Sequence, residues 1–179
     1  EVVLAVDGPI EALLQQIVDA PSPSGDEAAL ADGIERALLQ STHLEVIREG
    51  NTVAARTSLS RQHRVVWAGH IDTVPVGNNL PSRVAEDMLW GRGSVDMKGG
   101  VAIGLALAVE LESPHHDVTW IFYDNEEVEA SRNGLGLFGA AHPDWVSGDF
   151  AIVGEPSNGA IEGGCNGTLR VVIETSGKQ

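Results

Sequence analysis

The stretch VVWAGHIDTVPV, residues 65–76, decides how this chain folds. Its first five residues are apolar or small, a pattern typical of a strand buried on both faces of a parallel sheet. The strand ends in His70 and Asp72, which are two positions apart. Side chains spaced in this way on a strand point to the same face. The stretch therefore predicts a buried strand that carries an imidazole and a carboxylate at its carboxyl end.

Helical and strand patterns alternate on both sides of this stretch. Helices are expected over residues 8–20, 26–40 and 97–112, and a short one within 133–145. Strands are expected over residues 44–50, 52–58, 64–69, 117–124, 150–154 and 167–177. Helices that alternate with nearly continuous apolar strands indicate an α/β fold. We predict a three-layer sandwich with a mostly parallel sheet covered by helices on both faces.

The composition excludes several classes of protein. The chain has 26 acidic and 11 basic residues and a net charge of −15, whereas nucleic-acid and anionic-membrane partners require a basic surface. No apolar run approaches the roughly 20 residues of a membrane span, and residues 1–16 do not resemble a signal peptide. A single cysteine, Cys165, is interpreted as a small packed residue and favours a reducing compartment. We therefore expect a cytoplasmic protein.

Acidic or metal-binding side chains follow three of the predicted strands. His70 and Asp72 follow the first, Glu126 and Glu127 the second, and Glu155 the third. If these strands are parallel neighbours, their carboxyl ends meet at one edge, where α/β sheets bind ligands. Several carboxylates in one place repel each other, and a bound cation relieves that repulsion. Imidazole with carboxylates is a normal ligand set for zinc.

Each of these residues also has a simpler interpretation when it is taken alone. His70 could be a satisfied core histidine, and Asp72 could cap a turn. Asp96 precedes a predicted helix and could be its N-cap. Residues 126–129 could begin a solvated helix, and Glu155 could lie in a surface loop. The metal hypothesis depends on the recurrence of such residues after three buried strands.

Five motifs, in this order, resemble those of the aminoacylase, carboxypeptidase and succinyl-diaminopimelate desuccinylase family of two-zinc amide hydrolases. The resemblance covers nearly the whole chain and is strongest to the actinobacterial type of the desuccinylase branch. It implies a zinc exopeptidase-like catalytic domain. The motifs are PSPSGDE (21–27), GHIDTVP (69–75), GRGSVDMKGG (91–100), YDNEE (123–127) and VGEPS (153–157).

The resemblance implies a ligand set for two zinc ions, with cobalt or manganese as possible substitutes. His70 and Glu155 would bind the first ion, Glu127 the second, and Asp96 would bridge both. Asp72 would not touch the metal; it would hydrogen-bond to the other nitrogen of His70 and fix its tautomer.

The resemblance also implies the chemistry of the site. Glu126 would be the general base that takes a proton from a metal-activated water and returns it to the leaving amine. A cis peptide bond is expected between Asp96 and Met97. The implied reaction is hydrolysis of N-succinyl-LL-2,6-diaminopimelate to succinate and LL-diaminopimelate, in lysine biosynthesis.

The same resemblance predicts the organisation of the whole enzyme. Residues 1–179 would form the N-terminal part of the catalytic domain. An inserted lid and dimerisation domain and a C-terminal return of the catalytic domain would lie outside this chain. The resemblance implies that the second zinc takes a histidine from that downstream part, and none of the six histidines here lies in the context of that motif. The full-length enzyme is expected to be a homodimer that acts on a small N-acyl amino acid.

Two other functions fit parts of the sequence. Another N-acyl-amino-acid deacylase or a dipeptidase of the same family would share all the motifs. A non-catalytic cation-binding module, for example one stabilised by calcium, would explain the acidic strand ends. Calcium prefers six to eight oxygen ligands, so the histidine favours zinc and catalysis.

Overall fold

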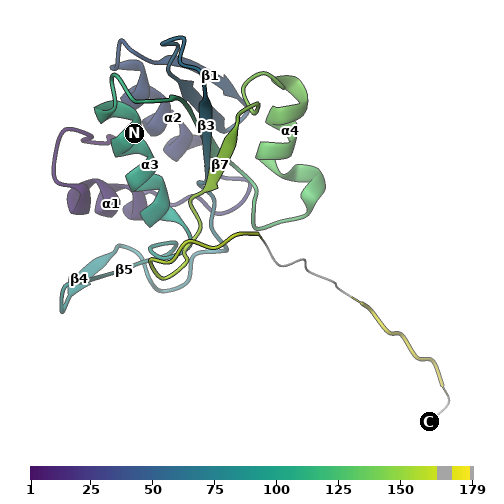
Figure 1. Cartoon of the computed structure of the whole chain (residues 1–179). Coiled ribbons are helices and arrows are strands. Elements are labelled where there is room, and N and C mark those ends of the chain that lie inside the picture. Colours follow the sequence, from purple (N-terminus) through teal and green to yellow (C-terminus); the bar gives the residue numbers. More distant parts are fainter. Residues whose placement is uncertain (165–170, 178–179) are drawn as a thin grey trace.

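A five-stranded mixed sheet forms the centre of the computed structural model, which describes residues 1–164 and 171–177 (Figure 1). In spatial order its strands are β1 (Glu45–Glu49), β2 (Thr52–Arg56), β6 (Asp117–Tyr123), β3 (Arg64–His70) and β7 (Phe150–Val153). The last three are parallel neighbours, whereas β2 is antiparallel to both β1 and β6. Four of the five strands therefore run in one direction, as predicted for a mostly parallel sheet.

Helices cover both faces of the sheet, which confirms the predicted sandwich. Three pack against one face, and α4 packs against the other together with Trp145. Side chains of β6 alternate between the two cores: Trp120 and Phe122 enter the first, Ile121 and Tyr123 the second. The helices are α1 (Ile10–Asp19), α2 (Ala28–Leu39), α3 (Lys98–Glu110) and α4 (Gly134–Ala141).

The predicted positions of the helices α1 to α3 and of the five sheet strands agree with the structure to within two residues at each end. Periodicity explains this agreement for α1, where Leu13, Ile17 and Val18 form the buried stripe. Among the described helices, none combines the length and apolar character needed to cross a membrane.

A small hairpin between β3 and α3 has no counterpart in the prediction. Its strands are β4 (Arg83–Ala85) and β5 (Met88–Trp90), joined by Glu86 and Asp87 with φ angles of 52° and 59°. Two positive φ angles are what a two-residue type I′ turn needs, usually from Asn-Gly or Asp-Gly. Strands of three residues, joined by a turn without glycine or asparagine, give no recognisable pattern in the sequence. The short 3-10 helix η1 (Ala130–Arg132) was missed for the same reason of length.

The strand predicted over 167–177 is wrong for residues 171–177, which have no regular structure. A strand requires a hydrogen-bonded partner, and within the described ranges no strand lies beside this segment, which Figure 1 draws apart from the sheet. Residues 165–170 lie outside the described residues, and with them the interpretation of Cys165.

The register of the parallel strands brings the sequence motifs to one edge. His70 at the end of β3 pairs with Tyr123 at the end of β6, and Ala68 pairs with Val153 at the end of β7. The segments that follow these strands therefore emerge side by side. This arrangement is the parallel neighbourhood on which the predicted metal site depended.

Candidate metal centre

His70 is the most buried of the predicted ligands, with 1% of its surface exposed. Its Nε2 lies 3.0 Å from Oδ1 of Asp96 and 3.9 Å from Oε1 of Glu155. On the other side of the ring, Nδ1 lies 3.0 Å from the backbone oxygen of Asp72 and 3.2 Å from its Oδ1. Nδ1 is thus held by Asp72, and Nε2 faces the carboxylates of Asp96 and Glu155.

The charge state of His70 reflects the carboxylates around it. Burial lowers the pKa of the imidazole, but Asp72 above all, and then Asp96 and Glu155, outweigh burial and raise that pKa to about 9. The protonated ring supplies positive charge to an acidic cluster. When the ring is neutral, a metal cation bound at Nε2 would supply this positive charge to the cluster instead. The side chains around Nε2 therefore fit a metal site.

Asp72 is fully buried and ties the three motifs together. Its carboxylate accepts hydrogen bonds from Oγ of Ser24 (2.7 Å) and from the backbone N–H groups of Glu126 (2.9 Å) and Glu127 (3.1 Å). Burial raises the pKa of Asp72, but His70 and these donors outweigh it and leave the pKa lowered. These partners are distant in sequence, so Asp72 is not a local turn cap. It fixes both the His70 ring and the backbone of Glu126–Glu127.

Asp96 enters the site from the segment before α3. The peptide bond between Asp96 and Met97 is cis, as predicted. The helix begins at Lys98 with Met97 in the cap position and has no side-chain cap, so the simpler interpretation of Asp96 as an N-cap is wrong. The interpretation of residues 126–129 as a helix start is also wrong, because these residues are not helical and the next helix after β6 begins at Ala130.

Three of the predicted ligands converge. One ligand atom from each of His70, Asp96 and Glu127 lies within 4.8 Å of the other two. Ligand atoms around zinc, at bond lengths of about 2.0–2.1 Å, are roughly 3.4 Å apart, so these three atoms are close enough to belong to one metal centre. The pKa of Glu127 is raised, first by burial and then by Asp96. A carboxylate that is difficult to ionise beside others is one that a cation would stabilise.

Glu155 and Glu126 lie next to these three residues. Burial and then the neighbouring carboxylates raise the pKa of Glu155, although His70 lowers it, and its carboxylate is the more distant one from the imidazole. The charge of Glu126 contributes to the raised pKa values of both Glu127 and Glu155. All six predicted site residues therefore gather at the ends of β3, β6 and β7, with their individual roles still predictions.

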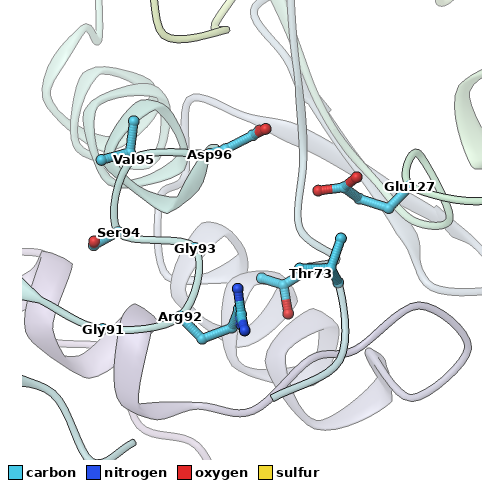
Figure 2. A pocket seen from close by; sticks show the side chains of 9 residues that line it. Thr73, Gly91, Arg92, Gly93, Ser94, Val95, Asp96 and Glu127 are labelled. Carbon is cyan, nitrogen blue, oxygen red and sulfur yellow. The ribbon is translucent and has the colours of Figure 1, made fainter. Parts of the chain in front are cut away.

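Several residues at the site were not singled out in the sequence. Ser24 supports Asp72 from the PSPSGDE motif, where its segment runs beside Thr73. Lys98 is buried and its Nζ donates to the backbone oxygen of Ala20 at 2.6 Å. A cavity of about 440 Å³ opens beside Asp96 and Glu127 and is also lined by Thr73 and Arg92 (Figure 2). The motifs themselves were the available signal, because each of these residues lies inside one.

Comparison with known proteins identifies the family. A sequence model of peptidase family M20/M25/M40 matches residues 66–171, which is more than half of the chain. The chain belongs to peptidase family M20/M25/M40. The match includes the segments that carry His70, Asp96, Glu127 and Glu155, so it supports the recognition of this family from motifs.

Relatives within the family include proteins from two actinobacteria. The chain is 53% identical over 170 residues to a protein of Mycobacterium tuberculosis named putative succinyl-diaminopimelate desuccinylase, covering 94% of this chain and 48% of that protein. It is 47% identical over 173 residues to the succinyl-diaminopimelate desuccinylase of Corynebacterium glutamicum, covering 92% and 46%. The chain thus spans about half the length of these M20 relatives.

Solved structures of M20 proteins share the fold. The family carboxypeptidase Sso-CP2 of Sulfolobus solfataricus superposes with a TM-score of 0.68 at 16% identity, over 82% of this chain and 37% of that one. The YXEP protein of Bacillus subtilis, described as a dinuclear metal-binding peptidase, gives a TM-score of 0.56 at 20% identity, over 77% and 40%. These likenesses confirm the α/β architecture.

Proposed function

We propose that this chain is the N-terminal part of the catalytic domain of a zinc-dependent amide hydrolase. The convergence of His70, Asp96 and Glu127 at one sheet edge is the observation that carries the proposal. The proposed substrate is N-succinyl-LL-2,6-diaminopimelate, which is supported by identities of 53% and 47% to proteins named for that activity. The products would be succinate and LL-diaminopimelate.

The proposed ligand set contains two zinc ions in the complete enzyme. His70 and Glu155 would hold one ion, Glu127 the other, and Asp96 both, with a further histidine from outside this chain. When bound, zinc polarises the amide carbonyl and acidifies the attacking water. Asp72 would keep Nδ1 of His70 occupied, so that Nε2 alone faces the metal.

Glu126 would be the general base in this mechanism. Its backbone N–H is held by Asp72 at 2.9 Å, while its carboxylate is left out of the three-residue convergence. Glu126 would take a proton from the water as the new C–O bond forms. It would then give that proton to the amide nitrogen as the C–N bond breaks, which releases the amine. A carboxylate that binds no metal is free to accept a proton.

The proposal can be tested with the zinc-loaded full-length gene product. We expect kcat/KM to be higher for N-succinyl-diaminopimelate than for N-acetyl amino acids or dipeptides. Preference for one of those substrates would instead identify another deacylase or a dipeptidase of the family. E126Q should lower kcat by about 10²- to 10⁴-fold and leave bound zinc unchanged. Loss of metal in E126Q, with no hydrolysis by the wild type, would favour a cation-binding module.

The proposal extends to assembly and location. We propose a cytoplasmic homodimer, for which the family resemblance and the single cysteine are the support. Light scattering on the full-length gene product should give twice the mass of one chain, and a monomer would contradict the dimer.

A further inference from the structure

Arg92 and Thr73 line the cavity beside the proposed ligands Asp96 and Glu127. Figure 2 shows the guanidinium of Arg92 turned toward Thr73, with the carboxylates of Asp96 and Glu127 across the opening. The backbone at Gly93, next to Arg92, passes close to Thr73, because a Cβ at that position would lie 2.6 Å from Cγ2 of Thr73. The two side chains thus line the same cavity as the proposed ligands Asp96 and Glu127.

Both side chains have polar atoms that lack a partner. Nε of Arg92 and Oγ1 of Thr73 are buried and find no hydrogen-bond partner among the described residues. Thr73 is 1% exposed, and within residues 1–164 and 171–177 no carboxylate forms an ion pair with Arg92. Buried donors are almost always satisfied in native proteins, so an orphaned pair indicates an absent acceptor.

The missing acceptor is best explained as an anion. Arg92 is the only cationic side chain that lines this cavity in the described part of a chain with net charge −15. The planar guanidinium matches the two oxygens of a carboxylate, and a hydroxyl can donate a further hydrogen bond to it. A cation beside metal ligands would also help a negatively charged substrate to approach an acidic site.

We propose that Arg92 and Thr73 form a subsite for a carboxylate group of the substrate, next to the reacting amide. This inference rests on the proposed function and adds to it the residues that recognise the charged end of the substrate. Two carboxylates could occupy the subsite: the one at the far end of the acyl group, and the one on the amino acid.

Binding of a non-reacting dicarboxylate tests the subsite without requiring catalysis. Succinate is titrated into the zinc-loaded full-length gene product by calorimetry, with its uncharged diamide as a control ligand. We expect R92Q to weaken succinate binding by about 10- to 100-fold and T73V by about 3- to 10-fold. R83Q removes one positive charge from β4, outside the cavity, and should bind like the wild type. Equal succinate affinity in R92Q and the wild type would overturn the proposal, because succinate would then be held by metal alone.

Kinetics then distinguish the two sources of carboxylate. If Arg92 binds the acyl end, R92Q raises KM about 10- to 100-fold for an N-succinyl amino acid and leaves KM for its N-acetyl analogue unchanged. If it binds the amino-acid carboxylate, KM rises for both substrates. An unchanged KM for both overturns the subsite. If the wild type hydrolyses neither substrate, the proposed function fails, while the succinate titration still decides the subsite.

Discussion

The two halves of the candidate metal centre are built differently. The inner half, His70 with Asp72, is 1% and 0% exposed and lies at the end of the central part of the sheet. The outer half, Asp96 with Glu155, has side chains that are 56% and 41% exposed. The inner half is fixed by hydrogen bonds from Ser24 and the backbone of Glu126–Glu127, whereas the outer half contacts mainly the His70 ring. The fold therefore fixes the positions of His70 and Asp72, and we expect bound metal to fix the positions of Asp96 and Glu155.

The positions of the strands explain this difference. β3 is flanked by β6 and β7, and its carboxyl end is covered by the segment around Ser24. β7, which precedes Glu155, pairs only with β3 among the described strands and exposes Phe150, Ile152 and Val153. An interior strand holds its terminal residues more rigidly than an edge strand.

The largest effect should come from breaking the inner half. D72N removes a buried charge that accepts three hydrogen bonds besides its contact with His70. We expect a loss of about 3 kcal/mol in the free energy of unfolding and a zinc affinity at least tenfold weaker. Urea unfolding of the metal-free chain and zinc titration measure the two effects. Loss of zinc affinity without loss of stability would show that the inner half is not fixed by the fold.

A buried aspartate outside the site provides a control, which separates the effect of losing a buried charge from an effect on metal binding. Asp117, at the start of β6, accepts hydrogen bonds from the backbone of Leu59 and Arg61 and from Thr57. D117N should lower the free energy of unfolding by about 2 kcal/mol and leave zinc affinity unchanged. A weaker zinc affinity in D117N would mean that general destabilisation, not the inner half, explains the result for D72N.

Asp117 also predicts how stability depends on pH. Burial raises the pKa of Asp117, but its hydrogen bonds outweigh burial and bring the pKa below the usual 3.8. A group with a lowered folded-state pKa stabilises fully above its unfolded pKa and loses that contribution as pH falls through its folded pKa. Unfolding experiments at decreasing pH, followed by circular dichroism, should therefore show that the difference in free energy of unfolding between the wild type and D117N shrinks below pH 3.8. A difference that stays constant there would contradict this cause.

A smaller effect should come from forcing apart the two residues of the outer half. Gly100 in α3 faces the backbone of Gly154, which precedes Glu155, and a Cβ there would collide with the Gly154 oxygen. G100A should lower the free energy of unfolding by about 1–2 kcal/mol. It should also weaken zinc binding, because it would move Glu155 away from Asp96. G136A is the matched control, because a Cβ at Gly136 of α4 meets nothing within 4 Å. If G100A and G136A behave alike, the close approach of α3 to β7 does not position the outer half.

The smallest change in stability should come from the outer half itself. E155Q keeps the shape of an exposed side chain, so the metal-free chain should unfold within about 0.5 kcal/mol of the wild type. Zinc affinity should nevertheless fall, by about tenfold or more, if Glu155 binds metal. Dye-competition titration measures that affinity. Unchanged zinc affinity in E155Q would remove Glu155 from the ligand set.

The same contrast explains what could be predicted from the sequence. The strand at 64–69 and the acidic residues after each strand are local patterns, so the sheet edge with His70, Glu127 and Glu155 could be inferred, whereas the place of Asp96 came from the family resemblance. The contact of Ser24 with Asp72 joins residues 48 positions apart, which periodicity does not indicate. Arg92 was missed because its significance comes from lacking a partner, which only three-dimensional packing can reveal.

The zinc content of the folded chain tests the metal centre most directly. Equilibrium dialysis followed by metal analysis should be done on the wild type, H70A and the control H43A, whose Nε2 donates to the backbone oxygen of Ala108 in α3, away from the site. We predict at least one tightly bound zinc per wild-type chain, retained in H43A and lost in H70A. A folded wild type that binds no zinc, or an H70A variant that keeps it, would contradict a metal centre at His70, Asp96 and Glu127.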